Sequence, residues 1–233
     1  MCSCQDKRNV FLFELIQAPI CCDAGLRQSV KAACARRALF YHSPTEREFD
    51  VVSKSGRSLS EIEIFHIKHH PEFEQLIPSI IDALQQVIVA HHGRVGLQAG
   101  YPQGPFKLFE TSQKPQISLK DYVRRIAEHT YTSPASILSS FIYLDRLIQK
   151  FDLVITELNV FKLFFLAVRV ASKVIELRTL NNKNFAGVGG ITNKHLNELE
   201  ALFVSTLEFD ILISPLEFQR YSSRLYKHDC CGV

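Results

Sequence analysis

Residues 158–177 read LNVFKLFFLAVRVASKVIEL, and this stretch decides the fold. It has the length of a long helix, but its apolar residues occupy nearly every side instead of one stripe. A helix that is apolar all round has to be enclosed by other helices. Lys162, Arg169 and Lys173 interrupt the run, and no part of the chain approaches the ~18 apolar residues of a membrane span. We therefore expect a buried central helix, and no membrane partner.

Helical patterns with clear starts and stops flank this central stretch. A first helix is expected over residues 72–92, where apolar residues recur at the 3–4 spacing of one helical face, and Gly93 and Gly96 end it. Four of the five helices that follow begin at hydroxyl residues that can cap an N terminus, and two of these four have proline at the first position, where its missing N–H costs nothing. These expected caps are Ser118, Ser133, Thr192 and Ser214.

The remaining segments set the domain boundaries. Residues 1–70 have a mixed composition without a sustained period, which predicts a partly disordered arm. Residues 71–117 predict the first helix and a loop, five helices fill residues 118–228, and a tail follows at 229–233. Within the five-helix part, the stretch 178–191 carries an Asn-Asn pair and three glycines and predicts a loop.

Composition and motifs argue against several classes of function. A net charge of +3, from 27 basic and 24 acidic residues, lacks the concentrated basic face of a nucleic-acid-binding protein. No Ser–His–Asp order, glycine-rich phosphate loop or carboxylate pair points to an enzyme, and we expect no cofactor. The seven cysteines are odd in number and lie toward the chain ends. They favour a reducing, intracellular location, in the cytoplasm or the nucleus, over a disulfide framework.

Two local features have alternative interpretations. Candidate metal ligands are His66, His69 and His70, with His91 and His92. His66 and His70 lie at i, i+4, a spacing that suits zinc on a helix, but no HExxH pattern or paired CxxC accompanies them. We interpret them as solvated and expect no metal site. Cys230 stands fourth from the end, where prenylation signals lie, although Gly232 makes the match to such a signal poor.

Specific strings then carry a family resemblance. Residues 143–146 read YLDR, and residues 170–176 read VASKVIE. Both strings resemble signatures of the cyclin box, and residues 196–211 resemble its fifth-helix region. The strings PQISLKDY at 115–122, YTSP at 131–134, and NN at 181–182 followed by VGGI at 188–191 are similar to those of the PHO-type cyclins, whose plant relatives are called P- or U-type.

The resemblance implies both a fold and a function. The expected fold is all-α, a single cyclin box in which a five-helix bundle surrounds a buried central helix, preceded by an N-terminal helix. The expected function is that of a regulatory subunit that binds and allosterically activates a cyclin-dependent protein kinase. Lys173 and Glu200 resemble the cyclin pair that hydrogen-bonds the kinase backbone. The other predicted contacts are Val170, Val174, Glu176, Val204 and Phe209.

One departure from the family pattern concerns substrate docking and a charge pair. Many cell-cycle cyclins begin the box with a Met-Arg-x-x-Leu string that builds a substrate-docking patch, whereas residues 114–119 read KPQISL. We therefore expect no substrate recruitment through that patch. The missing arginine usually pairs with the aspartate of the third helix. We predict that Asp145 pairs instead with Arg124 or Arg125, with Arg125 preferred.

Two other functions fit the same fold. One is a cyclin-fold adaptor in transcription, although such adaptors usually show two boxes and a basic face. The other is a cyclin-like scaffold that binds a kinase-like partner without activating it. Kinase activity of the complex separates both from the activator.

Overall fold

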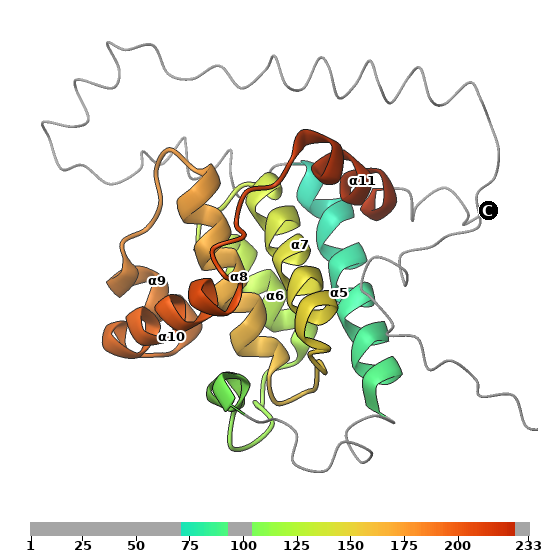
Figure 1. Cartoon of the computed structure of the whole chain (residues 1–233). Helices are drawn as coiled ribbons and strands as arrows, with labels where there is room; N and C mark the ends of the chain where they lie inside the picture. Colours follow the sequence, from blue (N-terminus) through green and yellow to red (C-terminus); the bar gives the residue numbers. More distant parts are fainter. Residues whose placement is uncertain (1–70, 93–103, 227–233) are drawn as a thin grey trace, which may run out of the picture. The chain divides into compact units, whose positions relative to one another are not determined.

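The computed structural model describes residues 71–92 and 104–226, and these segments are built from helices without any strand (Figure 1). The expected arm at 1–70 and the tail at 229–233 lie outside the described residues, as do His66, His70 and Cys230. No helix among the described residues is long and apolar enough to cross a membrane. The elements are α5 (Pro71–His92), the 3₁₀ helix η1 (Gly104–Phe109), α6 (Leu119–His129), α7 (Pro134–Phe151), α8 (Val160–Ile175), α9 (Asn182–Gly189), α10 (Asn193–Thr206) and α11 (Pro215–Leu225).

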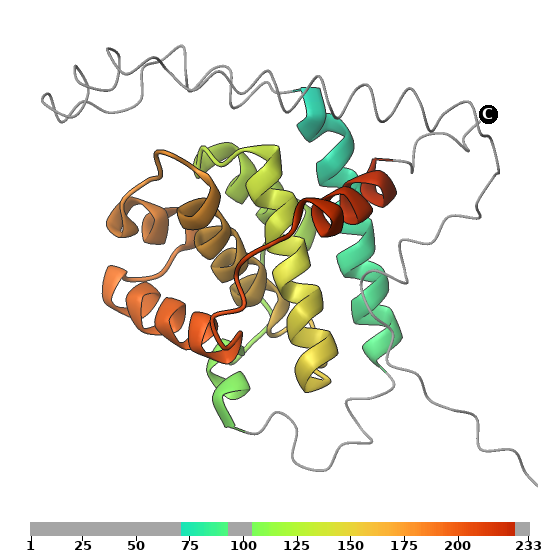
Figure 2. The ribbon, with the colours of Figure 1, turned by 45° about the horizontal axis from the view of Figure 1, so that its top comes forward.

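Helix α8 is the predicted central helix. Every residue from Leu163 to Ser172 is buried, and the helix packs most extensively on α7 and also on α10 and α6. Figure 1 shows α8 flanked by α7 and α10, and the same arrangement is visible in the turned view of Figure 2. The prediction of an all-α fold around a buried central helix is confirmed.

The predicted caps are also found. Each hydroxyl accepts a hydrogen bond from the backbone N–H three residues later, which satisfies one of the donors that a helix start leaves unpaired. The four pairs are Ser118 with Asp121 at 3.1 Å, Ser133 with Ser136 at 3.3 Å, Thr192 with His195 at 3.2 Å, and Ser214 with Glu217 at 3.2 Å.

The predicted loop at 178–191 is wrong, because it contains α9. Asn181 caps this short helix by accepting a hydrogen bond from Asn184 N–H at 2.8 Å. Phe185 is fully buried, and its ring centroid lies 4.9 Å from that of Phe165 on α8. Gly190, at φ 72°, ends the helix. Burial of one aromatic residue therefore outweighs the low helix propensity of the glycines.

The YLDR string ties the chain after α10 back to α7. The hydroxyl of Tyr143 donates to Ile211 O at 2.7 Å. The guanidinium of Arg146 donates from Nη1 to Asp210 O at 2.6 Å and from Nη2 to Leu212 O at 2.8 Å. Arg146 also pairs with Glu217 on α11 at 2.8 Å. We call these contacts of Tyr143 and Arg146 the α7 clamp; they hold the connection between α10 and α11 in an extended path.

Asp145, within the same string, is fully buried. Its Oδ2 accepts hydrogen bonds from the hydroxyl of Tyr221 on α11 and from Nε2 of Gln149, the latter at 2.7 Å. The predicted partner, Arg125, is instead exposed on α6, because the buried face of that helix is formed by Tyr122 and its apolar neighbours. The structure thus gives Asp145 a hydroxyl and an amide in place of Arg125.

Substitution of Gly189 tests the packing of α9. A Cβ at this position would overlap the ring of Phe165, whereas a Cβ at Gly187 would meet nothing within 4 Å. We expect Gly189→Ala to lower the free energy of unfolding by about 1–3 kcal/mol. Gly187→Ala is the matched control and should leave it unchanged or raise it by up to about 1 kcal/mol, since alanine favours a helix. Urea denaturation measures both, and equal effects would contradict the close approach of α9 to α8.

Substitution of Tyr221 tests the role of the buried carboxylate. Burial and the neighbouring Asp145 raise the pKa of Tyr221, so the hydroxyl stays protonated and donates. We expect Tyr221→Phe to cost about 1–3 kcal/mol of unfolding free energy, because it removes a donor from a buried charge. Tyr226→Phe is the control, since its hydroxyl reaches Glu72 at 3.3 Å in a half-buried position. Thermal unfolding should show a smaller loss of stability for Tyr226→Phe than for Tyr221→Phe. An unchanged midpoint for Tyr221→Phe would contradict a stabilising role for its hydrogen bond to Asp145.

Candidate partner-binding surface

The predicted pair of Lys173 and Glu200 is brought together by two packed helices. Lys173 lies in the last turn of α8, where a cation is favoured by the helix dipole, and Glu200 lies in the middle of α10. Lys173 Nζ is 2.5 Å from Glu200 Oε1. The two side chains are 40% and 13% exposed, so the pair is reachable from solvent mainly through the lysine.

A buried arginine and an asparagine extend this pair into the core. Asn182 Nδ2 donates to Glu200 Oε2 at 3.0 Å and to Asn197 Oδ1 at 2.5 Å. Asn182 Oδ1 accepts from Nε of Arg169 at 2.9 Å and also from its Nη2. Arg169 is 2% exposed, and its guanidinium carbon lies 4.8 Å from the Phe185 ring centroid, a cation–π contact.

These two residues are absent from the predicted site. In the sequence, Arg169 counts only as an interruption of the apolar run, and Asn182 only as part of a loop and of a string that carries the family resemblance. The sequence nevertheless contained a signal that Arg169 lies near the site. Arg169 precedes Lys173 by four residues and therefore lies on the same side of the helix.

The predicted apolar contacts fall into two groups. Val170 is 3% exposed and belongs to the core, and Val204 is half-buried. Val174 and Phe209 are 41% and 71% exposed. Four further exposed apolar residues went unpredicted: Ile175 and Leu177 at the end of α8, Leu212 in the connection after α10, and Leu216 at the start of α11.

The turn that carries Phe209 is strained. Glu208 and Phe209 both have left-handed backbones, at φ 53° and 61°, which cost energy for residues other than glycine. Phe209 N–H donates to Val204 O at 3.0 Å, and Glu208 pairs with Lys150 of α7 at 2.5 Å. The backbone thus holds an aromatic side chain in solvent, an arrangement typical of functional surfaces.

Glu176 is engaged inside the chain. Its Oε1 accepts hydrogen bonds from Ser133 N–H at 2.8 Å and from the hydroxyl of Ser136 at 2.5 Å. A carboxylate at this position also favours the N terminus of α7 electrostatically. The residue therefore joins the end of α8 to the start of α7.

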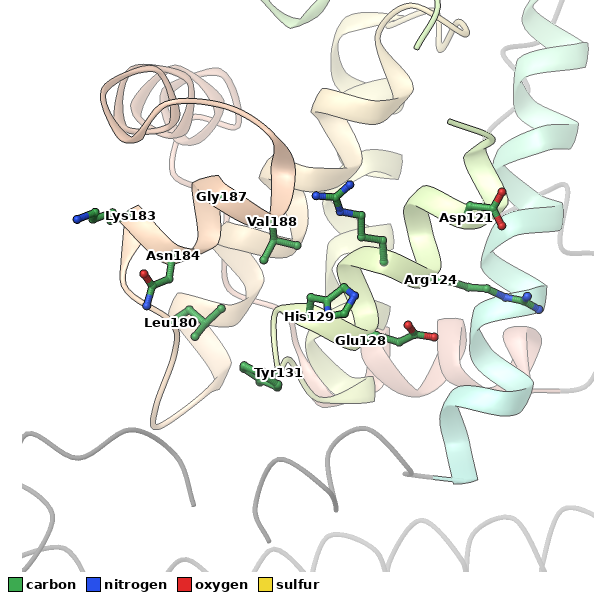
Figure 3. A pocket seen from close by; sticks show the side chains of 11 residues that line it. Asp121, Arg124, Glu128, His129, Tyr131, Leu180, Lys183, Asn184, Gly187 and Val188 are labelled. Carbon is green, nitrogen blue, oxygen red and sulfur yellow. The ribbon is translucent and has the colours of Figure 1, made fainter. Parts of the chain in front are cut away.

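A polar pocket lies elsewhere, between α6 and α9 (Figure 3). Its volume is about 1010 Å³. Figure 3 shows α6 on one side and α9 with the segment before it on the other. Its ionisable residues include Asp121, Arg124, Arg125, Glu128, His129 and Lys183. None of the predicted partner contacts lines it, and the described residues hold no cluster of three His, Cys, Asp or Glu side chains that could bind a metal ion.

Comparison with known proteins supports this architecture. Cyclin-U3-1 of Arabidopsis thaliana is 33% identical over 125 residues, which cover 54% of this chain and 57% of that protein. The match thus spans less than two thirds of that relative's length. Cyclin-U1-1, also of Arabidopsis thaliana, is 30% identical over 150 residues, 64% of this chain and 71% of that protein. Cyclin-P4-1 of rice is 34% identical over 118 residues, 50% and 56% of the two chains.

The family model described as Cyclin matches residues 28–211, so it begins within the stretch assigned to the arm. The matches to Cyclin-U and Cyclin-P proteins confirm the resemblance to the PHO-type branch. The helices that enclose α8 have the arrangement expected of a cyclin box, and the family model matches most of the chain. The chain belongs to the cyclin family.

Proposed function

We propose that this cyclin is a regulatory subunit that binds a cyclin-dependent protein kinase in the cytoplasm or nucleus and activates it allosterically, without catalytic chemistry of its own. The observation that carries the proposal is the Lys173–Glu200 pair, set at the surface by α8 and α10. A cation supplies hydrogen-bond donors and a carboxylate supplies acceptors, so together they can hold the backbone of one partner segment.

Exposed apolar residues complete the proposed contact. Val174 is adjacent to Lys173 on α8, and Phe209 follows α10. Exposed apolar side chains of this size mark partner sites when they gather around polar anchors. Val204, half-buried, lies one turn after Glu200, while Val170 and Glu176 support the surface from within the chain.

The proposed mechanism is a shift in the kinase's conformational population. A kinase whose C-helix is displaced lacks the Lys–Glu ion pair that positions ATP. A cyclin that binds only the ordered conformation raises its population. A shift from 1:99 to 99:1 needs ~5.5 kcal/mol of differential binding, which an interface with a few good anchors can supply.

Removal of the charged pair tests the proposal. Tagged wild-type protein and a Lys173→Ala/Glu200→Ala variant are used to capture partners from extract, and each eluate is examined by mass spectrometry and a kinase assay. We expect a cyclin-dependent kinase and its activity with the wild type, and at least a roughly tenfold loss with the variant.

The matched control removes another ion pair of the same type. Lys114 and Glu157 lie 2.7 Å apart with side chains 61% and 53% exposed, and Lys114→Ala/Glu157→Ala should capture the kinase as the wild type does. Absence of any cyclin-dependent kinase with folded wild type would overturn the proposal. A kinase that is captured without activity would favour the scaffold.

The strained turn offers a second test that separates binding from stability. Glycine adopts a left-handed backbone without strain, so we expect Phe209→Gly to keep or raise the thermal midpoint while capture of the kinase falls. Glu208→Gly, in the same turn, is the control: it also relieves strain but leaves the aromatic side chain in place. Unchanged capture with Phe209→Gly would remove Phe209 from the interface.

A further inference from the structure

The Glu200 carboxylate lies in the field of two cations that differ in mobility. Lys173 contacts Oε1 and is 40% exposed, on a flexible side chain. Arg169 is 2% exposed on the same helix and interacts with Glu200 electrostatically. Burial lowers the pKa of Arg169, and the charge of Glu200 opposes that effect. The buried cation and the carboxylate therefore stabilise each other.

Asn182 connects the buried cation to the carboxylate in one orientation. Nε and Nη2 of Arg169 are both donors, so they require the amide oxygen of Asn182 on their side. The amide NH₂ must then face the acceptors, and it donates to Glu200 Oε2 and to Asn197 Oδ1. Asn182 thus holds Oε2 of Glu200 from the side of the core, while Oε1 of Glu200 contacts Lys173.

The arginine itself has little freedom to move. Its guanidinium lies over the ring of Phe185. Phe185 belongs to α9, is fully buried, and packs against Phe165 of α8. The Arg169–Asn182 unit therefore joins the core of the protein to Glu200, the acidic member of the Lys173–Glu200 pair.

We propose that Arg169 and Asn182 are positioning residues that hold Glu200 in place when Lys173 leaves it to bind the kinase. This inference rests on the proposed function. Without such support, departure of Lys173 would leave the carboxylate of Glu200, which is 13% exposed, without a partner, and this is costly for a charge that is largely removed from water. With the buried unit present, Lys173 can exchange from Glu200 to a kinase carbonyl while the carboxylate keeps its orientation.

Two neighbouring asparagines supply the test. Asn182→Ala removes the contact with Glu200, whereas Asn181→Ala removes only the cap of α9, made to Asn184. The cyclin-dependent kinase identified by capture is titrated against each full-length variant, and thermal unfolding is followed in parallel. We expect both variants to be destabilised, but only Asn182→Ala to bind roughly tenfold more weakly. Arg169→Met, which keeps an apolar chain against Phe185, should follow Asn182→Ala.

A cycle with Glu200→Ala, which removes the acceptor of the Asn182 hydrogen bond, shows whether Asn182 acts through Glu200. If it does, Asn182→Ala will weaken binding in the wild-type background and have no further effect in Glu200→Ala. Effects that add in the double variant, or equal losses for Asn181→Ala and Asn182→Ala, would overturn the inference while the proposed function stands. If wild-type protein binds no cyclin-dependent kinase, the proposed function fails and the positioning role fails with it.

Discussion

Enclosure of α8 is the constraint on which the rest of the structure depends. Ten consecutive residues from Leu163 to Ser172 are buried, so neighbours are required on every side. The cost of leaving such a surface in water, about 25 cal/mol per Å² of apolar area, forces α7, α10 and α6 into contact with it. The same enclosure brings the last turn of α8 beside α10, and this places Lys173 against Glu200.

Local signals predicted most of the helices because they act over three or four residues. A hydroxyl before a helix satisfies a backbone donor whatever surrounds it, so Ser118 and Ser214 could be identified without the tertiary structure. Helix α9 could not, because its stability comes from Phe185 packing on a residue twenty positions earlier in the chain. Asp145 shows the same limit: Gln149 donates to it from the next turn of α7, but Tyr221, another of its donors, lies far along the chain on α11.

The candidate site was predicted in part for a comparable reason. Lys173 and Glu200 were expected from the family resemblance, and the structure pairs them. Arg169 and Asn182 were not expected in the site, because their connection to Glu200 needs the course of α9 to be known. Exposure also had to come from the structure, since a helical period cannot tell Val170, in the core, from Val174, at the surface.

Apart from the ion pairs of Arg146 with Asp210 and Glu217, the α7 clamp acts on backbone atoms, and this has a consequence for how the protein can diverge. Tyr143 and Arg146 donate to the carbonyl oxygens of Asp210, Ile211 and Leu212, which every amino acid possesses. The path of this segment is therefore largely insensitive to the side chains that it displays. Residues such as Leu212, 80% exposed, can be exchanged at little cost to folding. A lineage could thus alter its choice of partner by changing these side chains while the scaffold beneath them stays the same.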